Sequence, residues 1–397
     1  MRNEDELFEF AKQKLLDGRP ELKAEDGPGS LACLGVRFAL EFNADSISRR
    51  VACTQVERHM RLCLAATTGF ERLITLAGSE PLLAEAASQL MHDSGANPVR
   101  HLANNSDLHC IDRGRRGELV AALIIMQARD AAVAAQPPTQ RRRWVSVDDF
   151  MQALLPKDRY EDLQSSRPTS WRAGEDKPFA EMFQDYAMWF NHIIRIEKDK
   201  LINAEYLWSF ITRGAMIMGT HNQNGVDIIL PLCLKTGVLS RRTVSAILIQ
   251  VKNSDEYGCK IDKTLFDGLS PFRVGLFNEG STPRPVIRMV FALASSKSCV
   301  CFPEVRERPR TRYYDDFTAF DIWCAGLSSF KNIDGDLASY KILLDRSLQP
   351  HDAFELGELK DDKYLDDATR ELRGRRRRRM AALTMLHDEH HRLHIQQ

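Results

Sequence analysis

Two short apolar stretches decide the fold of this chain: Gly225-Val226-Asp227-Ile228-Ile229-Leu230-Pro231 and Ser245-Ala246-Ile247-Leu248-Ile249-Gln250-Val251-Lys252-Asn253. Both are rich in β-branched and other apolar residues, which is typical of strands buried on two faces. Asp227 lies near the start of the first predicted strand. Gln250 and Lys252 lie two residues apart near the end of the second, so their side chains leave the same face.

The connection between the two predicted strands brings these polar side chains together. Residues 232–244 are long enough to reverse the chain, so the strands can pair as antiparallel neighbours. Asp227 would then lie beside Gln250 and Lys252. A polar or charged side chain in an apolar layer is costly unless it has a partner. The pattern therefore predicts either a ligand at this point or mutual pairing of the side chains.

These three residue types suit metal-assisted phosphodiester hydrolysis. A carboxylate and an amide oxygen are hard ligands suited to Mg²⁺. A lysine next to such an ion can orient or deprotonate a water molecule. We therefore expect Asp227 and Gln250 to bind Mg²⁺ or Mn²⁺ and Lys252 to act on the attacking water. The alternative is that Asp227 and Lys252 form a buried ion pair that ties the strands together and has no catalytic role.

The motif resembles that of a known nuclease superfamily. Gly-Val-Asp at 225–227, a spacer, and Gln-x-Lys at 250–252 on an apolar strand are similar to the motif of the PD-(D/E)xK superfamily, which has the restriction-endonuclease-like fold. The form with glutamine in place of the acid resembles the Mrr-type restriction endonucleases. The wider stretch also resembles uncharacterised multi-copy fungal proteins. The nuclease resemblance covers roughly residues 200–300.

The resemblance implies an α/β fold, with a mixed sheet flanked by helices, and Mg²⁺-dependent cleavage of DNA. It also implies that the Val251 carbonyl is a metal ligand. Gln250 departs from the acid that the superfamily usually has, and its neutral amide implies a lower metal affinity. The departure leaves open a catalytically inactive protein of the same fold that binds nucleic acid or a protein partner.

The superfamily further implies an acidic residue on a helix before the first strand, and two residues are alternatives for this role. Glu205 lies in a predicted helix over 204–212, which Asn203 can N-cap. If that helix packs antiparallel on the following strand, its N-terminal half lies near the hairpin turn that precedes the motif. Glu118 lies in the first turn of the predicted helix 116–127, which is apolar nearly all round and therefore buried. A glutamate at either helix start also has a simpler role, facing water or complementing the helix dipole.

Patterning along the chain predicts four regions and their elements. We expect a mainly helical region over 1–135, a linker or insertion over 136–178, the nuclease-like core over 179–350 and a polar, Arg-rich tail over 351–397. The predicted helices are 4–16, 51–67, 69–77, 81–92, 116–127, 179–197, 204–212 and 336–348, with a break at 25–30. The further predicted strands are 215–220, 286–294 and 319–324.

Composition limits the remaining possibilities. The 397 residues are 43% hydrophobic and carry a formal net charge of zero, so nucleic-acid binding would depend on local clusters such as Arg373 to Arg379. No apolar run approaches the ~18 residues that cross a bilayer, so we expect no membrane association. The nine cysteines include no Cys-x-x-Cys pair, which favours reduced thiols in an intracellular protein, nuclear if the source is eukaryotic. Nothing in the sequence predicts an oligomeric state.

Overall fold

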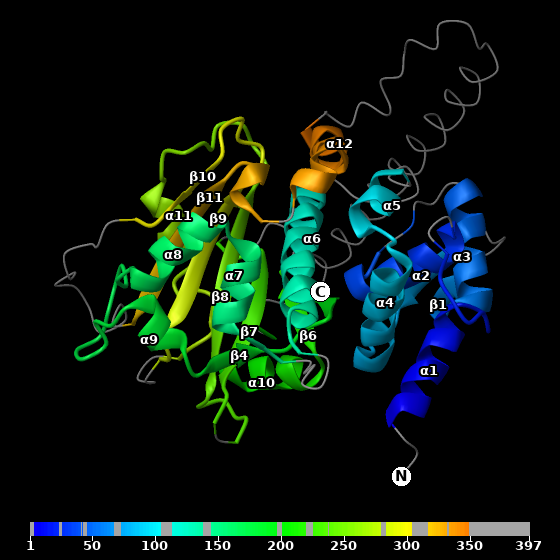
Figure 1. Ribbon diagram of the computed structural model, residues 1–397, viewed down its shortest axis with the longest axis horizontal. Coiled ribbons are helices and arrows are strands. Elements are labelled where there is room, and N and C mark those ends of the chain that lie inside the picture. The colour runs from blue at the N-terminus through cyan, green and yellow to red at the C-terminus, as the bar shows by residue number, and fades with distance from the viewer. Residues whose placement is uncertain are drawn as a thin grey trace, which may run out of the picture. The chain divides into compact units, whose positions relative to one another are not determined.

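The computed structural model is an α/β protein with helices around a nine-stranded mixed sheet, and this confirms the predicted fold class (Figure 1). Residues 1–349 form one unit. The structure describes residues 4–23, 26–40, 42, 46–66, 73–104, 113–137, 144–196, 201–219, 225–236, 238–278, 283–303, 317–331 and 333–348.

The sheet has the strand order β10-β11-β9-β8-β7-β4-β3, with β6 also paired to β7 and β5 to β6. β8 pairs antiparallel with β7 and parallel with β9, so the predicted hairpin is confirmed. Its strands are β3 (Val145–Ser146), β4 (Tyr186–Met188), β5 (His192–Arg195), β6 (Ala215–Met218), β7 (Ile228–Leu234), β8 (Val244–Lys252), β9 (Val286–Ala292), β10 (Cys299–Cys301) and β11 (Ala319–Ala325).

Twelve helices in the described residues surround this sheet or form the N-terminal region. They are α1 (Glu4–Leu15), α2 (Gly27–Phe38), α3 (Ser46–Arg58), α4 (Pro81–Ser94), α5 (Pro98–Asn104), α6 (Arg113–Ala134), α7 (Val147–Leu154), α8 (Lys157–Ser165), α9 (Phe179–Phe183), α10 (Ala204–Thr212), α11 (Lys263–Gly268) and α12 (Leu337–Leu348). A separate two-stranded sheet consists of β1 (Arg61–Ala66) and β2 (Leu73–Ala77). No described helix has both the length and the apolarity needed to cross a bilayer.

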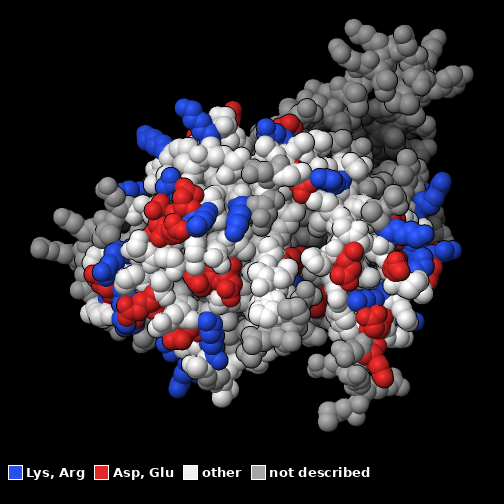
Figure 2. Space-filling model, in the orientation of Figure 1, with Lys and Arg blue, Asp and Glu red and all other residues white. Residues whose placement is uncertain are grey.

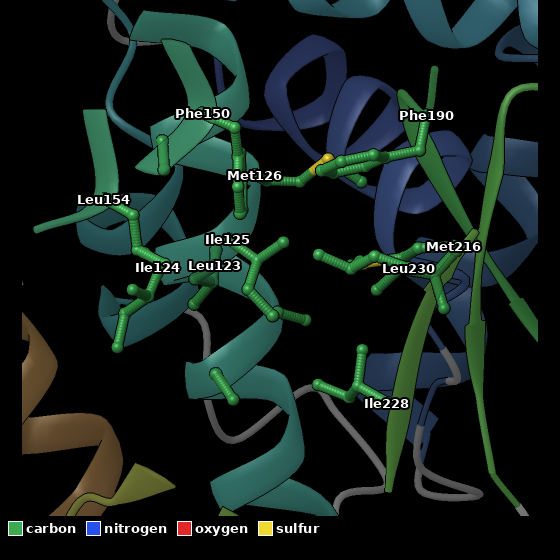
Figure 3. Packing of buried hydrophobic residues seen from close by; sticks show 14 of the residues in the cluster. Leu123, Ile124, Ile125, Met126, Phe150, Leu154, Phe190, Met216, Ile228 and Leu230 are labelled. Carbon is green, nitrogen blue, oxygen red and sulfur yellow. The ribbon is translucent and has the colours of Figure 1, made fainter. Parts of the chain in front are cut away.

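The central strands are apolar throughout because helices cover both faces of the sheet. Ile247 and Ile249 of β8 pack in the cluster that contains α6 and α7, whereas Ala246 and Leu248 pack in the cluster that contains α10 and α11. Figure 3 shows the first cluster, where α6 and α7 meet Phe190 and the strands β6 and β7. Burial on both sides removes the alternating pattern that a one-sided strand would show.

Three predicted helices contain strands, since 51–67 is helical only as far as Arg58 and then forms β1. The segment 179–197 is helical only in α9 and then forms β4 and β5, while 69–77 contains β2. β4 pairs with β3 and β7, β5 pairs with β6, and β2 pairs with β1. These helix predictions were wrong because cross-strand pairing outweighs a weak local periodicity.

The predicted break at 25–30 is the start of a helix. Asp26 caps α2, since its Oδ1 accepts a hydrogen bond from Gly29 N at 3.1 Å. Pro28 lies in the first turn, where its missing N–H has no intrahelical partner to lose. Gly27 and Pro28, which were expected to break the secondary structure, therefore lie at the start of helix α2.

The region 136–178, expected to be a linker or insertion, contributes to the unit through its described residues. β3 pairs with β4, α7 packs on α6, and Ser170 forms a β-bridge with Ala319. The segment 147–154 forms α7, with the Ser146 side chain accepting a hydrogen bond from Asp149 N at 3.0 Å. Residues 144–178 thus pack on α6 and pair with β11.

A buried polar network joins α2, α4 and α6 to the start of β5. Arg37 donates to both carboxylate oxygens of Asp130, at 2.8 and 2.9 Å, and Arg129 donates to Glu85 at 2.7 Å. The two arginines are each 1% exposed. Burial, together with nearby arginines, lowers the pKa of His192 to about 4, so this histidine is neutral at physiological pH. The network ties the N-terminal helices to the sheet.

Candidate functional site

Asp227 lies just before β7, between the ends of β6 and β8. Its backbone N donates to Ile249 O at 2.9 Å, and its backbone O accepts from Gly219 N at 2.8 Å. Its carboxylate Oδ2 accepts from Val251 N at 2.6 Å. The Asp227 carboxylate is therefore held against the backbone of β8 at the residue between Gln250 and Lys252.

Gln250 and Lys252 both project from the end of β8. By the alternation of β8, they face the α10–α11 side of the sheet, in line with Leu248. Gln250 is 8% exposed, and its Oε1 has no hydrogen-bond partner among the described residues. The Lys252 ammonium lies 5.6 Å from the ring centroid of Tyr257. The three residues of the motif thus meet at one end of the sheet.

The electrostatic environment of this site disfavours a charged Asp227. Burial raises the pKa of Asp227 to about 6, although the hydrogen bond from Val251 N and the charge of Lys252 act in the opposite direction. A buried acceptor with no donor, such as Gln250 Oε1, costs about 1–3 kcal/mol. A cation near the carboxylate and the amide oxygen would stabilise the buried charge of Asp227 and would give Gln250 Oε1 a partner.

The loop after β8, Asn253 to Asp262, adds two groups that the motif did not predict. Tyr257 faces Lys252, and Asp262 caps α11 by accepting from Thr264 N at 3.0 Å. Hydrogen bonds from Thr264, and then the charge of Lys252, lower the pKa of Asp262. The Asp-x-Thr pattern at 262–264 is a recognisable capping signal, whereas nothing in the sequence linked Tyr257 to Lys252.

The structure does not bring Glu205 to Asp227. Glu205 Oε1 lies 3.3 Å from Arg241 Nη1, with both side chains more than 60% exposed. Arg241 precedes β8, while Lys252 ends it, and a strand of nine residues spans about 27 Å. The expected placement is wrong because α10 contacts β6, β7 and β8 and so crosses the strands, which brings its first turn to the β7–β8 connection.

Glu118 lies at the same end of β8 as the motif. A Cβ atom added to Gly117 would lie 3.0 Å from Asn253 Cβ, so α6 begins in close contact with the residue after Lys252. Glu118 is half-buried and is the sixth residue of α6, not in the first turn as predicted, because α6 begins at Arg113. It approaches from the α6 side of the sheet, whereas Gln250 and Lys252 face the α10–α11 side. Of the two alternative glutamates, only Glu118 is close to the end of β8.

Among the described residues, few side-chain oxygen atoms at this end of the sheet could bind a metal ion. Asp227 and Gln250 supply one carboxylate and one amide oxygen, a set that fits Mg²⁺ because this ion retains several water ligands. Within the described part of the chain, no group of three or more His, Cys, Asp and Glu side chains is placed to hold a metal ion. Any ion bound by Asp227 would therefore depend on Gln250, a backbone carbonyl and water for its other ligands.

Comparison with known families adds one finding. The family model described as Domain of unknown function (DUF8736) matches residues 23–267, more than half of the chain. The chain belongs to this family. The DUF8736 match includes α6, the β7–β8 hairpin and the loop after it. No curated protein and no solved structure matches the chain.

Charged side chains on the visible face of this DUF8736 protein are mixed in sign. Figure 2 shows Lys and Arg interspersed with Asp and Glu on the described surface, without one large basic area on this face. The arginine run at 373–379 and the histidines at 387–394 lie outside the described residues.

Proposed function

We propose that this DUF8736 protein is a metal-dependent nuclease that hydrolyses DNA phosphodiester bonds. The observation that carries the proposal is the convergence on β8 of a desolvated carboxylate, a buried amide oxygen without a donor and an ammonium group. The resemblance of the 225–227 and 250–252 motif to PD-(D/E)xK nucleases supports the same activity.

Each residue has a distinct role in this proposal. Asp227, Gln250 Oε1 and the Val251 carbonyl would hold Mg²⁺ or Mn²⁺, and Glu118 is the one of the two alternative glutamates that lies near this end of β8. When bound, such an ion polarises the scissile phosphate and lowers the pKa of a bound water. Lys252, positioned by Tyr257, orients the attacking water and stabilises the negative charge that develops on phosphate oxygens.

The direct test is cleavage of supercoiled plasmid DNA by the purified full-length chain. We expect nicking or linearisation with Mg²⁺ or Mn²⁺ and none with chelator. Parallel reactions with single-stranded DNA and RNA would define the substrate. If no nucleic acid is cut and calorimetry detects no binding of Mn²⁺, the nuclease proposal is wrong.

The neutral Gln250 favours a second candidate, an inactive protein of this fold that binds nucleic acid. Loss of the usual acid lowers the charge available to hold a divalent cation. Because the formal net charge of the chain is zero, phosphate binding would depend on local clusters such as Arg373 to Arg379. DNA binding that weakens steeply with salt, without cleavage, would favour this candidate.

Gln250→Glu is expected to tighten Mn²⁺ binding by about tenfold, because a second carboxylate joins Asp227. The same substitution should lower the metal-free free energy of unfolding by about 1–3 kcal/mol, since it adds a buried charge near a carboxylate. Calorimetry and thermal melting in chelator measure the two effects. Gln152→Glu, at an exposed position of α7, is the control and should change neither.

A further inference from the structure

Three cysteine side chains lie together at the edge of the large sheet. Cys299 and Cys301 are two residues apart on β10, so both leave one face, while Val300 between them packs into the core on the other. Cys259 comes from the loop after β8, and its Sγ lies 3.7 Å from Lys297 O. Cys259 and Cys301 both lie close enough to the Cys299 thiol to raise its pKa. All three are half-buried and unbridged.

Contacts of the neighbouring residues Gly258 and Trp323 hold the three cysteines together. Trp323 Nε1 donates to Gly258 O at 2.9 Å, and Trp323 is the cross-strand neighbour of Cys301. The loop residue next to Cys259 is therefore fastened to β11, beside β10. Cys299 and Cys301, on one extended strand, have Cα atoms about 6.6 Å apart, at the upper limit for a disulfide. Cys259 is thus the better partner for Cys299.

We propose that Cys259 and Cys299 form a disulfide when the protein meets a peroxide, and that this bond fastens the 253–262 loop to β10. The inference does not depend on the proposed nuclease activity. It has a consequence for the candidate site, because Tyr257 of the same loop faces Lys252. The Cys259–Cys299 bond would lie two residues from Tyr257 in the chain. Oxidation would therefore hold the Tyr257 ring near the Lys252 ammonium group.

The chemistry requires two thiols and one peroxide. Burial, and then hydrogen bonds from Cys259 and Cys301, raise the pKa of Cys299, so Cys299 remains a thiol at neutral pH. The Cys259 thiolate attacks one peroxide oxygen, the O–O bond breaks, and the released hydroxide takes up a proton to leave water. Cys299 sulfur then attacks the resulting sulfenic acid at sulfur. The S–S bond forms, the S–O bond breaks, and the Cys299 proton leaves with the hydroxyl as a second water.

The test uses the full chain with Cys53→Ser, Cys63→Ser and Cys110→Ser, which removes three of the six cysteines other than Cys259, Cys299 and Cys301. After treatment with hydrogen peroxide, we expect loss of two titratable thiols per chain and a Cys259–Cys299 peptide by mass spectrometry. Dithiothreitol should reverse both. Trypsin cleavage after the exposed Lys260 should slow by about tenfold, because the loop must open to be cut.

Further single substitutions separate the assigned pair from other pairings. Cys259→Ser should abolish the crosslink and the protection of Lys260, whereas Cys301→Ser should retain both. A crosslink between Cys301 and either other cysteine as the main product would overturn the assignment. So would retention of all six thiols of the background after treatment with a peroxide concentration that oxidises a free thiol peptide.

Discussion

Asp227→Asn is expected to abolish metal-dependent DNA cleavage while making the metal-free protein more stable. The amide removes the negative charge that would hold the cation. We expect a loss in rate of at least about 10²–10³, which is the cost of removing a single electrostatic stabiliser of a transition state. Asparagine retains an oxygen that can accept from Val251 N, the contact that Asp227 Oδ2 makes at 2.6 Å. The substitution therefore removes charge with little change in packing.

The stability effect follows from the raised pKa. Burial raises the pKa of Asp227 from 3.8 to about 6. Below pH 4 this carboxyl is protonated in both the folded and the unfolded chain, so it contributes no pH dependence. Between pH 4 and 6 the unfolded chain loses its proton first, so the stability of the wild-type protein falls as pH rises. Above pH 6 the cost levels off at about 2–3 kcal/mol.

Thermal melting in chelator at pH 4 and at pH 8 measures this difference. Asp227→Asn and wild type should differ little at pH 4, and the variant should melt several degrees higher at pH 8. Asp255→Asn, at an exposed position of the 253–262 loop, is the matched control and should melt like wild type at both pH values. If Asp227→Asn melts lower at pH 8, Asp227 is instead a stabilising partner of Lys252, and the catalytic role loses its support.

Asp321→Ala is expected to lower the free energy of unfolding by about 3–5 kcal/mol, because it leaves the Arg288 guanidinium buried without its partner. The side chains of Arg288 and Asp321 are 6% and 1% exposed. Arg288 donates to both Asp321 oxygens, at 2.6 and 2.8 Å, across the parallel strands β9 and β11. It also donates to Phe266 O at 2.9 Å, which fastens α11 to the sheet.

Urea unfolding of the variants measures this cost. Arg288→Met combined with Asp321→Leu should be much less destabilised than Asp321→Ala, since neither buried charge then remains unpaired. The difference between the two variants reports the penalty of an isolated guanidinium. A loss below about 1 kcal/mol for Asp321→Ala would mean that water or another group replaces the carboxylate.

The sequence alone determined the elements whose signals are local. The apolar runs of β7 and β8 predicted the hairpin, and the uninterrupted apolar surface of α6 predicted a buried helix. Asn203 predicted the start of α10, where its side chain accepts from Tyr206 N at 3.1 Å. Each of these signals lies within one turn or one strand, so neighbouring residues suffice to specify it.

Only the tertiary structure decided how these elements meet. Glu205 and Glu118 were both predicted at helix starts, but the crossing of α10 over three strands takes Glu205 to Arg241. The close approach of Gly117 to Asn253 brings Glu118 near the end of β8. β4 and β5 pair with strands far along the chain, as do Arg288 and Asp321, 33 residues apart. Such contacts depend on strand register and helix crossing, which are set by packing across the whole core and leave no periodic signal in the local sequence.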